Sequence, residues 1–490
     1  MSTRNLDFLF KPKSVVIIGA SKKPLSVGYA LANNLINSQF SGEVFLVNPA
    51  YADDPAYCSS IDELPGTPDL AVIAAPAEVI PELLQALGEL GTKAVSIITT
   101  GESEGLSAQN QAFHDRILEL AEPFLMRVIG PNCLGVISPR HHMNASFSHI
   151  QPTAGDIAFI AQSGSILTSV ADWASQHEIG FSHLLSMGDM IDVDIGDCID
   201  YLADDDDTRA ILIYLEAITD ARKFMSAARA ASRGKPVLVV KGGRYLSSAV
   251  AASHHTGSLA SSDKIYDAAF RRAGMLRVYS MSELFDAVET LSKTKPFKGN
   301  RIAVVTNGGG IGVMVTDDII AQSGKLAKLS DLTIDQLSQA LGDSWRRGNP
   351  VDVISDPDGV RYGQALNILL DAREVDVVLA LNSPTAINSS RNAAEVVVKQ
   401  LKRRPRAHVF TCWMGETYMG EVRHLFARHG IPSYDTPGQA VRAMMHMIHY
   451  QENQEQLTQT PSSSSKQFRP DKERVALIIE QAWLDDRCYV

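Results

Sequence analysis

Short runs of apolar residues alternate with longer helical stretches through the first third of the chain. The apolar runs are SVVIIGA (14–20), EVFLVNP (43–49), DLAVIAAP (69–76), AVSIITTG (94–101) and MRVIGPN (126–132). Continuous apolar runs that end in Gly, Pro or Asn and are separated by helices are typical of a parallel sheet covered on both faces. We therefore predict an α/β fold that begins with a doubly wound, Rossmann-like domain over residues 1–145.

A second pattern occurs twice further along the chain. DIAFIAQSGSILTSVADWA, from Asp156, and RIAVVTNGGGIGVMVTDDI, from Arg301, align strand for strand and turn for turn. The likeness continues, because GDMIDVD and AILIYLE in the first copy parallel GNPVDVI and VVLALNS in the second. A repeat of this length predicts two copies of one structural unit. We expect two flavodoxin-like domains, over residues 150–295 and 299–450.

The end of the chain differs in composition from the rest. QENQEQLTQTPSSSSKQ (451–467) is polar and rich in Ser and Gln, which predicts a linker. A single amphipathic helix, DKERVALIIEQAWLDDRCYV, follows it. One helix cannot bury its own apolar face, so we expect residues 451–490 to lead into a further domain or to dock on a partner.

Composition and charge limit the possible functions. Of the 490 residues, 45% are hydrophobic and 21% are charged, which is typical of soluble globular domains. A formal net charge of -11 and the lack of a basic stripe disfavour nucleic acid as the main partner. The sequence has no apolar run of about 18 residues and no signal-peptide pattern at its start, so we expect a cytoplasmic protein without a membrane contact.

Cysteines and acidic runs give no sign of a metal site. The five cysteines stand far apart without metal-ligand spacing, so we expect free thiols in a reducing compartment. We expect Cys133 to be a small buried residue. The run DDDD (204–207) indicates a solvated helix end or turn.

Four segments carry residues that suit a phosphorylated ligand. In the first, IGASKKPLSVG, the residues Gly19, Ser21 and Gly28 would let backbone N–H groups approach phosphate at a helix N-terminus. The full GxGxxG pattern is absent, and the second strand ends in Asn48 and Pro49 rather than in an acidic residue, which argues against NAD. A tight turn without a ligand stays the alternative.

The duplicated turns QSGS (162–165) and NGGGIG (307–312) are the second and third segments. Each places small residues where a strand gives way to a helix, so two helix N-termini could face anions. Glycine used for close packing is the alternative. In the fourth segment, SHHTGS, either His254 or His255 could be a neutral nucleophile near pH 7 that accepts a phosphoryl group. Exposed loop histidines without chemistry are the other interpretation.

Nine motifs in a fixed order carry a resemblance to a known family. They are GASKKPLSVG, AAPAE, TTGESEG, GPNCLGV, AQSGS, IYLEAITDARKF, HTGSLASSDKIYDAAFRRAG, TNGGGIGV and NPVDV. From about residue 5 to 450 the chain resembles the NDP-forming acyl-CoA synthetases, relatives of succinyl-CoA synthetase. The resemblance implies that the first domain binds CoA, that the second carries a phosphorylated histidine on a swinging loop, and that the third completes the active site.

The resemblance also assigns roles to residues. His255, directly before Thr256 and Gly257, matches the phosphohistidine, and Glu216 matches the carboxylate that orients it by hydrogen bonding. Two phosphate-binding turns are implied, formed by Ser163, Gly164 and Ser165 and by Asn307, Gly308, Gly309 and Gly310. The CoA groove would be lined by Gly19, Ser21, Asn48, Ala75, Pro76, Thr100, Glu102 and Asn132.

The implied reaction converts acyl-CoA, phosphate and ADP reversibly into free acid, CoA and ATP, through an acyl phosphate and phospho-His255. Its nucleotide step needs an ATP-grasp module with a strand-borne Lys and acidic metal ligands, and we recognise none in this sequence. We therefore expect acetyl-CoA or another acyl-CoA and phosphate as ligands. ADP or ATP and Mg would act only through an ATP-grasp subunit or domain. The resemblance also implies association into an oligomer.

A second likeness leaves an alternative open. NASFSHI, MGDMIDVDIGDCIDYLADD, TDARKFMSAARAASRGKP and HMIHYQENQEQL resemble the ligase-like region of bacterial GNAT-type protein lysine acetyltransferases. In those proteins the region is regulatory and binds acetyl-CoA. The alternative function is therefore an acetyl-CoA-sensing region, although we recognise no GNAT domain here and the sequence keeps both His255 and Glu216.

Overall fold

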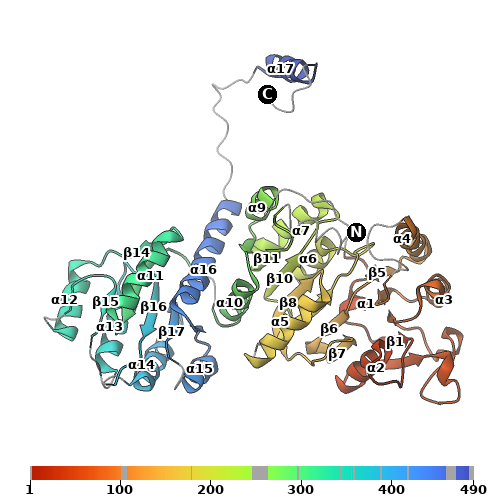
Figure 1. Cartoon of the computed structure of the whole chain (residues 1–490), viewed down its shortest axis with the longest axis horizontal. Coiled ribbons are helices and arrows are strands. Elements are labelled where there is room, and N and C mark those ends of the chain that lie inside the picture. The colour runs from red at the N-terminus through yellow and green to blue at the C-terminus, as the bar shows by residue number, and fades with distance from the viewer. Residues whose placement is uncertain are drawn as a thin grey trace. The chain divides into compact units, whose positions relative to one another are not determined.

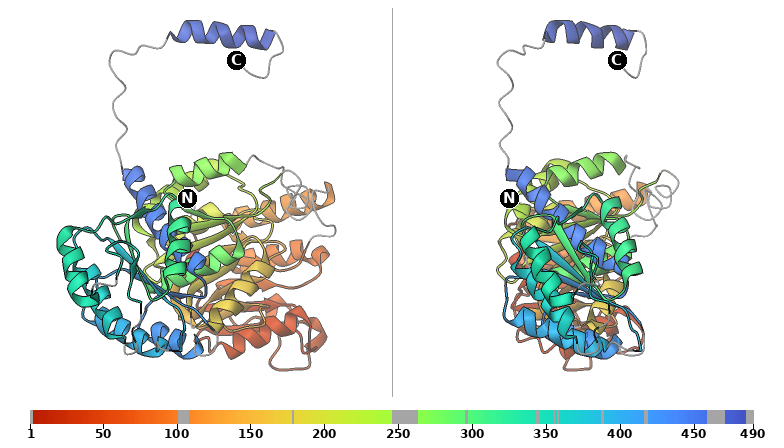
Figure 2. Two further views of the ribbon diagram at one scale, coloured as in Figure 1. Left: turned by 60° about the vertical axis from the view of Figure 1, so that its left-hand side comes forward. Right: turned by 90° about the vertical axis from the view of Figure 1, so that its left-hand side faces the viewer.

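The structure is a computed structural model (Figures 1 and 2). It describes residues 3–100, 108–177, 179–245, 263–294, 297–342, 345–354, 356, 359–386, 389–415, 419–458 and 471–484. The chain forms two compact units, Met1–Leu457 and Thr458–Val490. Within the described ranges, no helix is long and apolar enough to cross a membrane.

The first sheet has five parallel strands in the order β2-β1-β3-β4-β5. They are β1 (Ser14–Ile18), β2 (Glu43–Val47), β3 (Leu70–Ile73), β4 (Ala94–Ile97) and β5 (Arg127–Ile129). The associated helices are α1 (Asp7–Phe10), α2 (Val27–Asn37), α3 (Ile80–Leu90) and α4 (Ala108–Ala121), with 3-10 helices η1 (Pro49–Tyr51), η2 (Ile61–Glu63), η3 (Ala77–Val79) and η4 (Glu122–Phe124). Strands β1, β3 and β4 are buried along their whole length, which explains their apolar sequences. The predicted Rossmann-like fold is confirmed.

The second sheet has the order β12-β11-β10-β8-β9-β6-β7. Its strands are β6 (Gly135–Ser138), β7 (Met143–Ser146), β8 (Ala154–Ala161), β9 (Phe181–Ser186), β10 (Ala210–Leu215), β11 (Val237–Lys241) and β12 (Leu276–Val278). Its helices are α5 (Gly164–Gln176), α6 (Ile195–Asp204), α7 (Ala221–Gly234), α9 (Asp263–Arg272) and α10 (Met281–Lys293), and the 3-10 helix η5 (Pro139–His141) joins β6 to β7. The hairpin of β6 and β7 pairs antiparallel with β9. The division predicted near residue 145 therefore differs from the strand pairing, which places this hairpin in the second sheet.

The third sheet has the order β14-β13-β16-β17-β18, and β15 also pairs with β13. Its strands are β13 (Arg301–Thr306), β14 (Lys325–Leu326), β15 (Val351–Asp352), β16 (Val377–Asn382), β17 (Val409–Trp413) and β18 (Ser433–Tyr434). Its helices are α11 (Gly309–Ala321), α12 (Asp331–Leu341), α13 (Val360–Asp371), α14 (Ser390–Lys402), α15 (Met419–Arg428) and α16 (Pro437–Thr458). The strands β9, β8, β10, β11 and β12 of the second sheet follow the same order, which agrees with the predicted repeat.

One apolar core connects the second and third sheets. It contains buried residues of α5, α10, α11 and α16 together with strand residues from both sheets. Trp173 of α5 stacks on Phe285 of α10 with ring centroids 4.5 Å apart. Arg442 of α16 lies 3.5 Å from Asp286 of α10. Helices α10 and α16 therefore take part in holding the two flavodoxin-like units together.

Two sequence interpretations are wrong in detail. Residues 451–458 were expected to be linker, but α16 continues to Thr458. Its polar side chains bond to main chain of the second sheet, because Asn453 Nδ2 donates to the Met275 carbonyl and Gln454 Nε2 to the Gly274 carbonyl, each at 3.0 Å. In the acidic run 204–207, expected to be solvated, Asp205 is buried.

The second unit contains α17 (Lys472–Leu484), where the sequence predicted an amphipathic helix. Val475, Leu477 and Ile478 are each about half exposed or more in this helix. Considered by itself, α17 thus leaves apolar side chains uncovered, as the argument from a single helix expected.

Candidate functional site

The carboxyl ends of β1 and β3 meet where the strand order of the first sheet reverses, the usual ligand position in a doubly wound sheet. Gly19 follows β1 with a φ of +89°, and a Cβ there would lie 2.3 Å from the Ala74 carbonyl oxygen. A Cβ on Gly28 would lie 2.0 Å from the Gly19 carbonyl oxygen. The turn needs both glycines for its own packing, whether or not a ligand binds there.

Ser21 and Asn48 also stabilise this turn. Asn48 Nδ2 donates to the Ala20 carbonyl oxygen at 2.7 Å, and Ser21 Oγ accepts from the Lys23 N–H at 3.0 Å. These polar side chains thus fix the chain at the switch point. A role in binding CoA stays a prediction for both.

A cavity of about 730 Å³ has walls from the first and second sheets. Its lining consists of Val27, Ala74, Ile98, Thr99, Thr100, Asn132, Cys133, Leu134, Phe147, His149, Gly164, Ser165 and Thr168. Thr100 and Asn132, predicted for the CoA groove, thus share one cavity with Gly164 and Ser165, predicted for the phosphate. The predicted groove residues Gly19, Ser21, Asn48, Ala75 and Pro76 do not line it, and Glu102 lies outside the described residues.

A smaller cavity of about 220 Å³ adjoins the large one, because Asn132 and Gly164 line both. Its other lining residues are Gln162, Ser163, Gly188, Asp189, Met190, Ala217, Ile218 and Thr219. They come from the loops after β8, β9 and β10, at the carboxyl edge of the second sheet. The two cavities together connect the end of the first sheet with the N-terminus of α5.

The N-terminus of α5 has the properties of an anion site. Ser163 is the N-cap residue, but its side chain makes no capping hydrogen bond, so the first N–H groups of the helix are not satisfied by their own cap. Ser163 Oγ lies 2.9 Å from Ser165 Oγ, so two hydroxyl groups are placed beside these N–H groups. Hydroxyls and free N–H groups at the positive end of a helix dipole suit a phosphate.

Gln162 connects this turn to the end of β10. Its Oε1 accepts hydrogen bonds from the N–H groups of Glu216 and Ala217, the latter at 2.8 Å. The side chain therefore fixes the position of Glu216 relative to the N-terminus of α5.

Glu216, the predicted orienting carboxylate, accepts a hydrogen bond from the Tyr214 hydroxyl at 3.1 Å. Burial, together with the Glu216 charge, raises the pKa of Tyr214, so this hydroxyl stays a donor. Lys241 is buried at the end of the neighbouring strand β11, and burial lowers its pKa. The predicted nucleophile His255 and its neighbour His254 lie outside the described residues.

The second predicted phosphate turn also has an amide side chain that joins neighbouring strand ends, although its hydrogen bonds differ from those of the first. Asn307 Oδ1 accepts from the Ser383 N–H at 2.7 Å, and Asn307 Nδ2 donates to the Ser383 carbonyl at 2.9 Å, so the side chain ties β13 to β16 as Gln162 ties β8 to β10. Gly308 is the N-cap of α11, and a Cβ on Gly310 would meet nothing within 4 Å. Residues 307–310 line neither of the two cavities described above, so the structure does not bring this turn into that site.

A set of contacts along β5 joins the first and second sheets. The Val193 N–H donates to the Val128 carbonyl at 3.1 Å and the Asp189 N–H to the Pro131 carbonyl at 3.0 Å. Asn132 Nδ2 lies 3.3 Å from Asp189 Oδ1 at the cavity end of this line. We call these contacts between residues 127–132 and 189–193 the seam. It fixes Asn132 against the loop that lines the smaller cavity.

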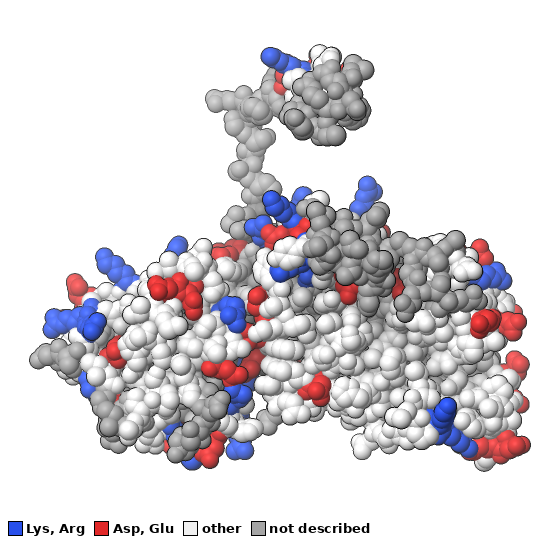
Figure 3. Space-filling model, viewed as in Figure 1, with Lys and Arg blue, Asp and Glu red and all other residues white. Residues whose placement is uncertain are grey.

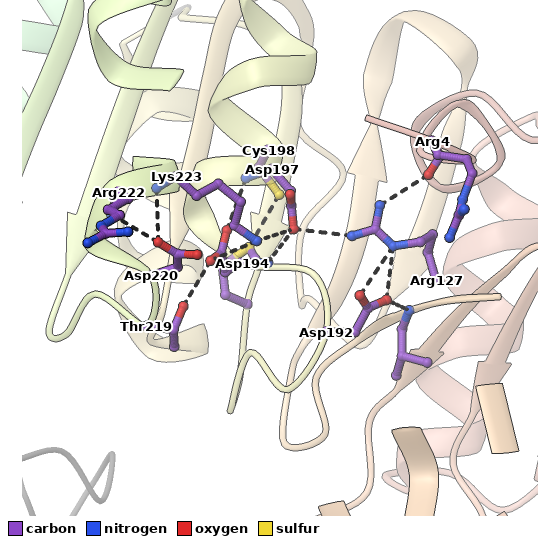
Figure 4. Close-up of polar contacts among 12 residues, drawn as sticks. Arg4, Arg127, Asp192, Asp194, Asp197, Cys198, Thr219, Asp220, Arg222 and Lys223 are labelled. Carbon is purple, nitrogen blue, oxygen red and sulfur yellow. Dashed lines mark hydrogen bonds and ion pairs between the residues drawn. The ribbon is translucent and has the colours of Figure 1, made fainter. Parts of the chain in front are cut away.

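Arg127 forms the charged end of the seam (Figure 4). Its side chain is 8% exposed, and it donates to Asp192 at 3.0 Å and to Asp197 at 3.1 Å. Lys223 Nζ lies 2.9 Å from the same Asp197 oxygen. Burial raises the pKa of Asp197 even though both cations lower it. Asp194 accepts from the Thr219 hydroxyl at 2.9 Å, so the network reaches a residue of the smaller cavity.

Sequence reasoning missed several cavity residues. Phe147, His149 and Thr168 line the large cavity although no periodicity marks them as functional. Asp189 also lines the small cavity, and His114 Nε2 of α4 lies 3.2 Å from its Oδ2. No local sequence pattern could have identified these residues. His114 and Asp189, for example, meet only once the two sheets are packed.

Cysteines and metal ligands give little further chemistry. Cys133 is buried as expected, and burial raises its pKa to about 11, so the thiol does not supply a ready thiolate. Over the ranges that the structure describes, no group of three or more His, Cys, Asp or Glu side chains is placed to hold a metal ion.

Two protein-family models match the chain. One, described as a CoA binding domain, matches residues 13–139. The other, described as a succinyl-CoA ligase like flavodoxin domain, matches residues 154–291. The matches cover the first sheet and, apart from β7, the second sheet, including the N-terminus of α5 and Glu216.

Curated relatives share most of this chain. Acetate–CoA ligase (ADP-forming) I of Archaeoglobus fulgidus is 38% identical over 442 residues, which are 90% of this chain and 63% of the relative. Subunit alpha of acetate–CoA ligase (ADP-forming) I of Pyrococcus furiosus is 36% identical over 448 residues, which are 90% of this chain and 96% of the subunit. The chain thus spans less than two thirds of the first relative and nearly all of the second.

A solved structure agrees with these relatives. The dinucleotide forming acetyl-coenzyme A synthetase 1 of Ca. Korarchaeum cryptofilum, in complex with phosphate and ADP, has a TM-score of 0.88 and 29% identity, covering 95% of this chain and 100% of that chain. The resemblance drawn from the motifs is confirmed. The chain belongs to the ADP-forming acyl-CoA synthetase family, and its length corresponds to that of the alpha subunit of the Pyrococcus relative.

Proposed function

We propose that this chain is the CoA-binding and phosphohistidine module of an ADP-forming acyl-CoA ligase, with acetyl-CoA as its first candidate substrate. One observation carries the proposal. Residues predicted for CoA, Thr100 and Asn132, line the same cavity as residues predicted for phosphate, Gly164 and Ser165. A thioester and a phosphate must meet in one site if they are to react with each other.

In the proposed first step, a phosphate oxygen attacks the thioester carbonyl, the C–S bond breaks, and CoA leaves as the thiolate. The N-terminus of α5 would hold the phosphate, and its dipole would stabilise the negative charge. In the second step, the His255 imidazole attacks phosphorus, the bond to the acyl oxygen breaks, and the carboxylate leaves. Glu216 would accept a hydrogen bond from the other ring nitrogen and so fix the histidine tautomer.

The proposal includes a partner for the nucleotide step. Transfer from phospho-His255 to ADP, with Mg, is assigned to an ATP-grasp subunit or domain. Two features of the relatives support this. The Pyrococcus protein is named a subunit alpha, and the Archaeoglobus protein is the longer chain, of which the alignment covers 63%. Residues 307–310 would bind the phosphoryl group of phospho-His255 after the histidine has left the N-terminus of α5. Oligomerisation, the domain bounds and a cytoplasmic location stay predictions.

The test is phosphoenzyme formation by the chain alone. Purified protein is incubated with acetyl-CoA and radiolabelled phosphate, and base-stable, acid-labile label on the protein is measured. We expect label on the wild type and on His254→Ala, the matched neighbour, and none on His255→Ala. Glu216→Gln should label at least about tenfold more slowly, because the histidine loses its orienting carboxylate.

The same experiment tests the alternative function, in which the chain is an acetyl-CoA-sensing regulatory region. An unlabelled wild type that still binds acetyl-CoA by calorimetry would overturn the ligase proposal and leave the sensor. The named relatives are ligases and synthetases, which favours the labelled outcome.

A further inference from the structure

A separate cavity of about 670 Å³ lies at the other end of the third sheet. Its walls come from the end of α10, from the end of α14 and the loop into β17, and from the turn between α15 and β18. This is the amino edge of β17, whereas Gly308 and Gly310 follow the carboxyl end of β13. Because β13, β16 and β17 are parallel, the two places lie at opposite edges of one sheet. The cavity is therefore distinct from the proposed ligase site.

The lining of this cavity carries cations and no carboxylates. Its residues are Lys293, Thr294, Val398, Leu401, Lys402, Arg404, Pro405, Arg406, Ala407, His408, Val409, His429, Gly430, Ile431 and Pro432. On the molecular face shown in Figure 3, acidic and basic side chains are interspersed. The lining of this cavity instead combines Lys, Arg and His side chains with apolar residues, and its volume is in the range of small-molecule sites.

Some of these cations are already paired and others are not. Lys293 Nζ lies 2.8 Å from Glu289, and Arg404 holds Asp371 with two nitrogens, at 2.8 and 3.0 Å. Within the described part of the chain, Lys402 and Arg406 have no ion pair or hydrogen bond of their side chains. These two side chains are therefore available to an anion.

One buried hydroxyl and two histidine side chains add polar groups to this cavity. Thr294 is 8% exposed, and among the residues that the structure describes its hydroxyl has no hydrogen-bond partner. A buried hydroxyl without a partner costs about 1–3 kcal/mol unless a ligand or water supplies the bond. His408 stacks on Phe297 with centroids 4.8 Å apart, and His429 uses Nδ1 on the Leu425 carbonyl at 2.8 Å, which leaves Nε2 for another contact.

We propose that this cavity binds a phosphorylated small molecule, with Arg406 and Lys402 on the phosphate groups and the Thr294 hydroxyl as a further hydrogen-bonding group. Guanidinium and ammonium groups are the usual partners of phosphate oxygens. The apolar residues of the lining, among them Leu401 and Ile431, would contact an uncharged part of the ligand. The chemistry fits an inorganic polyphosphate and a nucleotide equally, so the experiment separates the two.

Binding is measured by titration calorimetry on the full chain, with CoA present so that the CoA groove is occupied and without inorganic phosphate, which would compete with the probes. The probes are inorganic pyrophosphate and ADP. Arg406→Ala should lower the affinity for the probe about tenfold or more, since one charge-assisted hydrogen bond is lost. Arg403→Ala is the matched control, because it removes the same charge from the same loop at a residue that does not line the cavity; it should change affinity less than about twofold.

A second variant tests the buried hydroxyl. Thr294→Val keeps the shape, and it should reduce affinity severalfold without lowering the temperature of unfolding. Tighter binding of ADP than of pyrophosphate would assign a nucleotide, and the reverse order an inorganic polyphosphate. The proposal is overturned if neither probe binds at about 1 mM, or if Arg406→Ala and Arg403→Ala weaken binding equally.

Discussion

Replacing Arg127 by methionine removes the charged end of the seam while keeping a long side chain. Arg127 is 8% exposed and donates to Asp192, Asp197 and the Arg4 carbonyl. The variant leaves Asp197, whose side chain is 2% exposed, with Lys223 as its remaining cation. We therefore expect a clear loss of stability where the first and second sheets meet.

The size of the loss follows from burial. Removing one partner of a buried ion pair costs about 3–5 kcal/mol. Lys223 stays 2.9 Å from Asp197, so the cost should lie near the lower end, at about 3 kcal/mol. With a slope of roughly 3 kcal/mol per molar urea, the midpoint of the affected transition moves by about 1 M.

The loss should also depend on pH. Burial raises the pKa of Asp197 in the folded wild type, despite the opposing charges, and loss of Arg127 raises that pKa further. A carboxyl group whose folded pKa is raised favours folding below its unfolded pKa and loses that contribution as the pH rises through the folded pKa. The difference between variant and wild type should therefore shrink from pH 7.5 to pH 5.5.

Urea unfolding followed by circular dichroism and tryptophan fluorescence measures both effects. The double variant Arg127→Met, Asp197→Asn should recover part of the loss, because the uncompensated carboxylate is gone. Arg116→Met is the control, since its pair with Glu119 is exposed and is worth less than about 1 kcal/mol. Equal losses for Arg127→Met and Arg116→Met, or a loss that is the same at both pH values, would refute the reasoning.

Two further predictions concern other sites. Gly19→Ala should destabilise the chain by about 2 kcal/mol or more and weaken CoA binding, because φ is +89° and the new Cβ would lie 2.3 Å from the Ala74 carbonyl oxygen. Thermal unfolding measures the stability, and calorimetry measures CoA binding. Gly66→Ala is the control, because a Cβ at Gly66 meets nothing within 4 Å. Burial raises the pKa of Asp205, but contacts with His183, Lys11 and Thr208 outweigh burial and lower it. Asp205 thus stabilises the fold above its unfolded pKa of about 3.9, and this contribution is lost as the pH falls through the folded pKa. The Asp205→Asn variant should therefore unfold more easily at pH 7 than the exposed control Asp206→Asn. Below pH 4 it should lose less further stability than that control. Similar stability profiles of the two variants in acid would contradict this prediction.

Local sequence determined much of the fold. The apolar runs at residues 14–20 and 69–76 became buried central strands, because a strand covered on both faces needs apolar side chains at every position. The repeat indicated a shared strand order for the second and third sheets, since similar patterns fold into similar units. Small residues at the ends of β8 and β13 indicated where α5 and α11 begin.

The rest of the site depended on contacts between distant residues. Gln162 looked like part of a glycine turn, yet its side chain holds the main chain of Glu216. Asp205 belonged to a run of four aspartates, but in the structure it is buried and contacts Lys11, His183 and Thr208. Neither periodicity nor residue type encodes such pairings. The roles of Glu216 and His255 rest on the family resemblance and await the labelling test.

The hairpin of β6 and β7 has a practical consequence for dissecting the protein. A fragment that ends near residue 145 would carry the hairpin away from β9, its hydrogen-bonded neighbour. A fragment that starts near residue 150 would present β9 as a bare edge, and uncovered strand edges promote aggregation. Fragments cut after Asn132 would keep the hairpin with its own sheet, although they would still break the seam. Studies of one half in isolation should therefore choose that cut and supply the other half in trans.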